Sequence, residues 1–157
     1  MADGTTKAIE DIRLGDEVES TDPADDQSTA KDVLRAIRTA DDHEFTDLSL
    51  SDPANGSTPA QELTSTQHHP FWDATVQQWV EAANLQPGYE VRRADGGTSI
   101  VTVVRDYTTA PQAAYDLTIA DLHTYYVLAG ITPVLVHNSN PAQCELIFPG
   151  PNAREGV

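Results

Sequence analysis

Turn-forming residues divide this sequence into short segments. Glycine beside Asp or Asn, and proline among small polar residues, recur along the chain, and such pairs are typical of tight turns. The clearest examples are Gly15-Asp16, Asn55-Gly56, Pro87-Gly88 and Asp95-Gly96-Gly97. The segments between them are short and roughly alternate apolar with polar residues, as half-buried strands do. The sequence therefore predicts an all-β domain of short strands and hairpins.

The same patterns place individual elements. "VLRAIRTA" and "HEFTDLSL" predict two half-buried strands, and "YEVRRADGGTSIVTVVRDY" predicts a hairpin that turns at residues 95–97. The stretch Ser20–Asp32 predicts a loop, because Pro, Asp and Ser are frequent in it. We expect a short helical stretch to end at Pro87 and the last two strands to be separated at Gly130.

The net charge of −16 limits the partners of this chain. So acidic a surface repels phosphate backbones, and we therefore expect no nucleic-acid binding. No apolar run approaches the roughly 20 residues that a membrane span needs, so no span is expected. The single cysteine, Cys144, excludes an internal disulfide framework. The acidic residues are interpreted as a solvated surface that favours solubility.

Histidine is the residue type here that is best suited to chemistry at neutral pH. The chain has five: His43, His68, His69, His123 and His137. They lack the partners and spacing of a zinc site, and we expect neither a metal nor a cofactor. Two of them follow polar residues at short range. Thr66 lies three residues before His69, and Asp116 lies seven residues before His123, so that a strand and its turn could return both to one cleft.

The segment "TPVLVHNSNP" ends an apolar strand at three polar residues, His137, Asn138 and Ser139. The Asn138 carboxamide nitrogen could attack its own main-chain carbonyl, close a succinimide and expel the amine of Ser139. A poor nucleophile and a poor leaving group make proton transfer and oxyanion stabilisation necessary, and adjacent imidazoles supply both. The alternative is a plain strand end, with Asn as a turn residue.

Three stretches together resemble the Hint superfamily, which includes inteins, hedgehog autoprocessing domains and the pretoxin Hint domains of bacterial polymorphic toxins. "ADGTTKAIEDIRLGDEV" is similar to the part that follows the family's N-terminal nucleophile. "TSTQHHPFW" is similar to its Thr-and-His block, and "YDLTIADLHTYYVLAGITPVLVHN" to its two C-terminal blocks. The sequences "HPFW" and "HTYYV…VLVHN" within these stretches are most similar to the pretoxin branch of the family. The resemblance covers about residues 2–139 and implies a compact horseshoe of short strands.

The resemblance also implies a self-processing activity and the residues that perform it. The positions that match the family's motifs are Thr66, His69, Asp116, His123, His137 and Asn138, with Ser139 as the first residue of the downstream partner. We expect the domain to act in cis as a monomer and to carry a covalently linked C-terminal toxin or other cargo. A secreted or cell-surface location within a larger bacterial toxin is implied by the resemblance alone.

The sequence departs from the family pattern at its start. The family opens with a nucleophilic Cys or Ser on a strand that would precede "ADGTT", and Cys144 lies beyond Asn138. The N-terminal acyl shift is therefore expected only in a longer parent protein. We interpret residues 1–138 as a Hint domain without its first strand, and residues 139–157 as the start of the downstream segment.

Two other interpretations stay open at this point. A catalytically degenerate Hint domain could serve as a spacer that presents its C-terminal cargo without cutting it. An unrelated all-β binding module could carry "VHN" by accident, although the order of the motifs argues against it. Substitution of Asn138 separates self-processing from both, because succinimide formation requires its carboxamide.

Overall fold

The computed structural model describes residues 1–53, 60–138 and 147–148. The strands are β1 (Glu17–Asp22), β2 (Gln27–Ser51), β3 (Gln61–Thr66), β4 (Pro70–Asp73), β5 (Gln78–Glu81), β6 (Glu90–Arg92), β7 (Thr98–Ile119), β8 (Thr124–Ala129), β9 (Thr132–His137) and β10 (Ile147–Phe148). Two 3-10 turns, η1 (Ile9–Asp11) and η2 (Ala82–Asn84), are the only helical elements in the described part of the chain. No helix found there is long and apolar enough to cross a membrane. The expected all-β architecture is confirmed.

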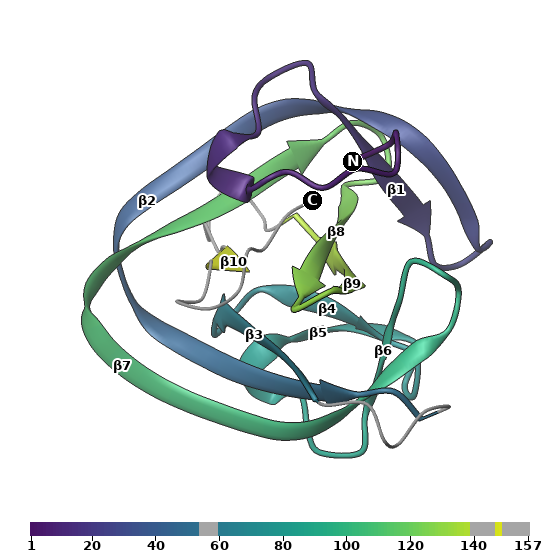
Figure 1. Cartoon of the computed structure of the whole chain (residues 1–157). Helices are drawn as coiled ribbons and strands as arrows, with labels where there is room; N and C mark the ends of the chain where they lie inside the picture. Colours follow the sequence, from purple (N-terminus) through teal and green to yellow (C-terminus); the bar gives the residue numbers. More distant parts are fainter. Residues whose placement is uncertain (54–59, 139–146, 149–157) are drawn as a thin grey trace.

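Two very long strands, β2 and β7, form the frame of the molecule. They pair antiparallel from Val33↔Ile119 to Ser51↔Ile100, with several bulges that allow the ribbon to bend. Figure 1 shows this ribbon curving around the other strands like a horseshoe. "VLRAIRTA" and "HEFTDLSL" therefore belong to one continuous strand, β2, and not to two.

The prediction of a loop at Ser20–Asp32 is wrong. These residues form a hairpin, in which β1 pairs with the start of β2 from Glu17↔Asp32 to Asp22↔Gln27. Only residues 23–26 form the turn, which Asp26 closes at φ +61 by donating its N–H to the Asp22 carbonyl. Most side chains on the β2 arm are exposed, so their polarity reflects solvent contact and not an irregular backbone.

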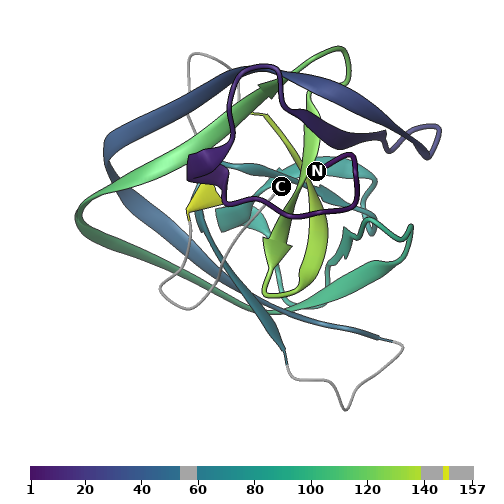
Figure 2. The same cartoon turned by 45° about the horizontal axis from the view of Figure 1, so that its top comes forward.

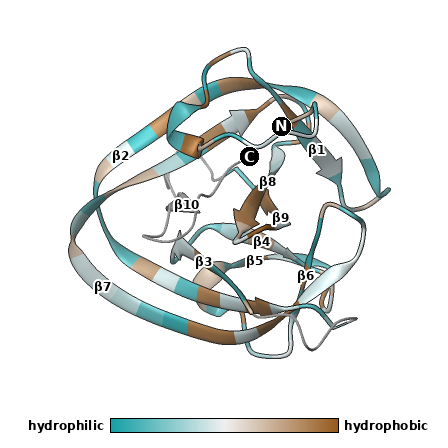
Figure 3. Ribbon diagram, viewed as in Figure 1, coloured by the Kyte–Doolittle hydropathy of each residue, from teal (hydrophilic) through white to brown (hydrophobic). Residues whose placement is uncertain are grey.

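The hairpin of β8 and β9 lies inside the horseshoe. Figure 1 and the view turned by 45° in Figure 2 both show it enclosed by the β2–β7 ribbon, and Figure 3 shows it as one of the most apolar parts of the chain. Its turn lies at Gly130, whose φ of +59 suits glycine, and this break was expected from the sequence. Tyr125, Val127, Val134 and Val136 are buried in the main core. Each buried aliphatic side chain there contributes about 1.5–3 kcal/mol. This burial holds the end of β9, at His137, in a fixed position.

Hydroxyl groups close the seam between the two ends of the sheet, β1 and β8. Thr124 Oγ1 lies 2.7 Å from Ser20 Oγ, accepts from the Thr21 N–H at 3.1 Å and donates to the Thr21 carbonyl at 2.8 Å. The Tyr126 hydroxyl lies 2.7 Å from Thr21 Oγ1. These buried bonds replace a regular backbone ladder at the seam and hold the start of β8 against β1.

Candidate functional site

Asn138 directly follows β9 and is held by the backbone of the neighbouring strand. Thr124 pairs with His137 at the end of the β8–β9 ladder. The Asn138 N–H then donates to the His123 carbonyl at 2.8 Å, which continues the ladder by one more pair. The backbone of Asn138 is therefore fixed at the point where the sequence predicts cleavage.

The imidazole of His137 lies against the carbonyl of the next residue. Its Nδ1 is 2.6 Å from the Asn138 main-chain oxygen. A carbonyl oxygen only accepts hydrogen bonds, so Nδ1 carries the proton and donates. This carbonyl belongs to the peptide bond between residues 138 and 139. The donor is thus aimed at the oxygen on which negative charge would develop if Asn138 attacked that bond.

Two rings surround the His137 imidazole. Its ring centroid lies 5.0 Å from that of Trp79 on β5, in an edge contact at 66°, and 6.1 Å from that of His123. Burial lowers the pKa of His137 below 6.5; the hydrogen bond to the Asn138 carbonyl acts in the opposite direction, and the neighbouring His123 adds to the lowering. The imidazole is therefore mainly neutral at pH 7, with a proton on Nδ1 and a lone pair on Nε2.

In contrast to His137, the side chain of His123 is exposed to solvent. Its φ of +59 lies in the left-handed region, which is uncommon for a residue with a side chain. The next residue, Thr124, is tied into the β1–β8 seam by its hydroxyl. That anchor compensates the strained backbone and keeps the His123 carbonyl in place for Asn138.

The Asn138 side chain is almost buried, with 8% of its surface exposed. Within the described part of the chain, its Oδ1 has no hydrogen-bond partner. A buried amide oxygen without a donor costs about 1–3 kcal/mol. The carboxamide is therefore held by packing rather than by bonds to its oxygen. We call His123, His137 and Asn138 the junction group.

A second set of predicted residues lies in the core. Thr66 ends β3 and His69 precedes β4, and the His69 N–H donates to the Thr66 carbonyl at 3.3 Å, closing a tight turn. His69 is fully buried, and its ring centroid lies 6.0 Å from that of Phe71 and 6.4 Å from that of Tyr125. The expected proximity of Thr66 and His69 is therefore present in the fold.

Asp116 is also buried and belongs to this second set. Its Oδ1 accepts the Tyr125 hydroxyl at 2.7 Å and the Leu117 N–H at 2.7 Å. Burial raises the pKa of Tyr125 well above 10, and the negative charge of Asp116 adds to the effect. Tyr125 thus contacts both Asp116 and the ring of His69. We call Thr66, His69, Asp116 and Tyr125 the interior group.

Asp116 and His123, which the sequence suggested could share one cleft, differ in burial. Asp116 lies in the buried interior group, whereas His123 is exposed in the junction group. The two groups are neighbours along the same hairpin, because Tyr125 pairs with Val136, the residue before His137. Sequence reasoning missed Tyr125 and Trp79. The signals available were the aromatic pair in "HTYYV" and the second Trp of "WDATVQQW".

Ser139 and Cys144 lie outside the described residues. Beyond them, β10 returns to the same sheet. It pairs with β3 through Ile147↔Ser65 and Phe148↔Thr64, and with β7 through Ile147↔Tyr115. Two residues of the segment interpreted as downstream thus lie between β3 and β7 in the strand order.

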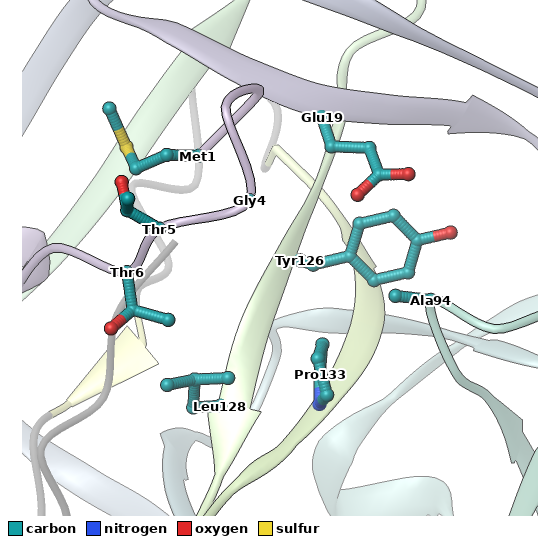
Figure 4. Close-up of a pocket in the computed structure, with 9 residues that line it drawn as sticks. All are labelled: Met1, Gly4, Thr5, Thr6, Glu19, Ala94, Tyr126, Leu128 and Pro133. Carbon is teal, nitrogen blue, oxygen red and sulfur yellow. The ribbon is translucent and has the colours of Figure 1, made fainter.

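A small pocket lies apart from both groups, near the start of the chain. Its volume is about 100 Å³, and it is lined by Met1, Gly4, Thr5, Thr6, Glu19, Ala94, Tyr126, Leu128 and Pro133. Figure 4 shows Met1, Thr5 and Thr6 on one side, facing Tyr126, Ala94 and Pro133 on the other. No predicted site residue lines it. In the described ranges, no three His, Cys, Asp or Glu side chains are arranged to hold a metal ion.

Comparisons with known proteins agree with this architecture. The model of the pretoxin HINT domain family matches residues 1–139. A bacterial intein-like domain from Clostridium thermocellum is 29% identical, with a TM-score of 0.69, over 84% of this chain and 88% of that one. A DnaB intein from Synechocystis is 17% identical, with a TM-score of 0.62 over 87% and 89% of the two chains, and so shows the fold alone. No curated protein sequence matches the chain.

Proposed function

Because the chain belongs to the pretoxin HINT domain family, we propose that it cleaves the peptide bond after Asn138 by cyclisation of that residue. The fold is the intein-like, self-processing fold that the sequence resemblance implied. One observation carries the proposal: the 2.6 Å contact between His137 Nδ1 and the Asn138 carbonyl oxygen. A donor at that oxygen supports attack on the carbonyl carbon and has no evident use in a plain strand end.

The reaction balances without water or a cofactor. Asn138 Nδ2 attacks the main-chain carbonyl carbon of its own residue, and a C–N bond forms that closes a five-membered ring. The C–N bond to Ser139 breaks. One proton leaves Nδ2 and arrives at the amine of Ser139, which departs as a new N-terminus. The upstream product ends in a succinimide and is one water lighter than its hydrolysed form.

In this mechanism His137 stabilises the oxyanion. Its Nδ1–H already points at the carbonyl oxygen, so little reorganisation is needed as charge develops there. One preorganised donor of this kind contributes about 10²–10³ in rate. The lowered pKa of His137 keeps the lone pair on Nε2 available at neutral pH, and that nitrogen can relay the proton. His123 lies next to it, exposed to solvent, and is proposed to exchange protons with it.

Thr66, His69 and Asp116 are assigned a different task. We propose that in a longer parent protein Thr66 and His69 bind the N-terminal junction, while Asp116 polarises or orients the site. Asp116 and His69 both contact the buried Tyr125, which lies two residues after His123, and the Thr66 carbonyl accepts the His69 N–H. These contacts support the proposal. The N-terminal acyl shift belongs to that parent, with a Cys or Ser nucleophile ahead of residue 1.

The product released after Asn138 is proposed to be a toxin or other cargo. Ser139 is its first residue, and the Hint domain corresponds to residues 1–138. We propose a role in a secreted or surface-borne bacterial toxin, which membership of the pretoxin family supports. Because β10 lies in the same sheet, the two products can stay associated after cleavage.

The test is intact mass under denaturing conditions, which separates associated products. The chain is extended by a small folded reporter after Val157 and followed over time. We expect a fragment that ends at Asn138 and has the succinimide mass, and Asn138→Ala should yield none. Ser139→Ala is the matched control and should still cut, because the amine and not the hydroxyl leaves. Cleavage that persists in Asn138→Ala would refute the mechanism.

A second function, a spacer that presents cargo uncut, is favoured by the position of β10. A downstream strand that pairs with β3 and β7 would anchor the cargo to the domain. In that case the extended chain stays intact while circular dichroism shows a folded β protein. Appearance of the succinimide fragment would reject the spacer.

A further inference from the structure

The His137 imidazole needs more than its hydrogen bond to keep its orientation. A single Nδ1–H···O bond leaves the ring able to turn about its side-chain bonds, because His137 is only half buried. The indole of Trp79 packs against this ring, with the centroids 5.0 Å apart and the rings at 66°. Edge contacts at this separation are favourable between aromatic rings.

Trp79 is itself held in place by its own hairpin. On β5 it pairs directly with Trp72 on β4, and the two indoles contact each other at 5.2 Å with an interplanar angle of 69°. β4 in turn pairs with β9 through Phe71↔Val136, next to His137. A chain of ring contacts therefore runs from Trp72 through Trp79 to His137, on strands that are hydrogen-bonded to one another.

We propose that Trp79 is a positioning residue for the cleavage reaction: its indole holds the His137 imidazole with Nδ1 toward the Asn138 carbonyl and shields it from water. This inference rests on the proposed cyclisation of Asn138. Trp79 touches neither the carboxamide nor the scissile carbonyl by any described contact. It acts through His137, and its effect should appear in the properties of that imidazole.

The first measurement is the cleavage rate of reporter-extended variants at pH 7. We expect Trp79→Ala to be slower by about tenfold to a hundredfold, because small misplacements of a reacting group cost about that much. Trp79→Phe keeps an aromatic ring and should recover most of the rate. Trp72→Ala is the control, since it removes an equal indole one ring contact further from His137 but keeps the Trp79 ring and the β4–β5 pairing, and its loss should be smaller.

The second measurement does not depend on cleavage. The pKa of His137 is measured by NMR in the uncut Asn138→Ala chain, with and without Trp79→Ala. Loss of the indole exposes the imidazole to water, so its pKa should rise toward the ordinary value near 6.5. His123 is the titratable side chain with a described ring contact to His137. It is unchanged in both chains. The charged side chain of Glu81, two residues after Trp79 on β5, is hydrogen-bonded to His68 and is also unchanged in both chains.

The two measurements separate the failure of each proposal. If the unsubstituted chain does not cut, the proposed function fails, while the NMR titration still tests the role of Trp79. Unchanged His137 titration in Trp79→Ala would overturn the positioning role. Equal rate losses in Trp79→Ala and Trp72→Ala would overturn it as well, because general weakening of the hairpin would then explain both.

Discussion

The junction group and the interior group are built from similar residues but are held in different ways. In the junction group, the described contacts among His123, His137 and Asn138 run through backbone carbonyls and one tilted ring contact. In the interior group, buried side chains bond to one another, as Tyr125 does to Asp116. The first arrangement places the reactive groups at a strand end, with Asn138 buried and His123 exposed. The second is part of the core, so its loss should affect stability before it affects rate.

The largest effect expected from this contrast is on the cleavage rate in the junction group. Removing the oxyanion donor with His137→Ala should slow cleavage after Asn138 by about 10²–10³, or roughly 3–4 kcal/mol in the barrier. His137→Gln, which can still offer an amide N–H, should retain more activity. Rates come from intact mass, and urea unfolding of both variants in the Asn138→Ala background measures stability. A His137→Ala chain that cuts at the full rate would remove the assigned role of this donor.

The next effect is on the free energy of unfolding in the interior group. Tyr125→Phe removes the hydroxyl that donates to the buried Asp116 carboxylate, and hydrogen bonds to charged groups contribute about 1.5–3 kcal/mol. The rate of the folded protein should change by less than about tenfold. Tyr107→Phe is the matched control, because its hydroxyl also donates to a carboxylate, that of Asp47, at a half-buried position.

Tyr107→Phe should cost less, because Asp47 keeps the bonds from Thr64 and Arg105. Urea unfolding of both variants, in the uncut Asn138→Ala background, gives the comparison. Equal losses in the two would show that burial of the carboxylate adds nothing. A large rate loss in Tyr125→Phe without loss of stability would move Tyr125 from the core into the reaction.

The sequence predicted much of the fold because strand and turn patterns are local. The hairpin at residues 95–97 and the break at Gly130 follow from turn chemistry alone, and both are present. The prediction of a loop at Ser20–Asp32 was wrong because an exposed hairpin arm and a loop have the same polar composition. The length of β2 also escaped prediction, because its pairing partner, β7, lies far along the chain.

The site was predictable where its residues are close in sequence. Thr66 and His69 meet in one tight turn, and Asn138 follows His137 directly. Contacts between distant strands carry no such signal. Trp79 reaches His137 only through the pairing of β5 with β4 and of β4 with β9. A tryptophan in a short strand is more simply interpreted as core, so no local pattern assigns Trp79 to the site.

The smallest expected effect is a difference in how the two groups respond to pH. The pKa of His137 is lowered in the folded protein, so below about 6.5 the unfolded chain binds the proton more readily. The contribution of His137 to stability is therefore present above pH 6.5 and is lost as the pH falls toward the folded pKa. Tyr125 has a raised pKa, and its contribution is present below pH 10 and lost as the pH rises above it.

Urea unfolding of the uncut Asn138→Ala chain across pH 5–11 tests both signs. Subtracting the same curve for His137→Gln should remove part of the acid loss and leave the alkaline loss intact. Subtracting the curve for Tyr125→Phe should do the reverse. Each pH unit between the folded and unfolded pKa contributes about 1.4 kcal/mol, so the shifts are resolvable by denaturant midpoints. If His137→Gln altered the alkaline side instead, the two groups would be coupled, and their separation into a reactive junction and a structural interior would not hold.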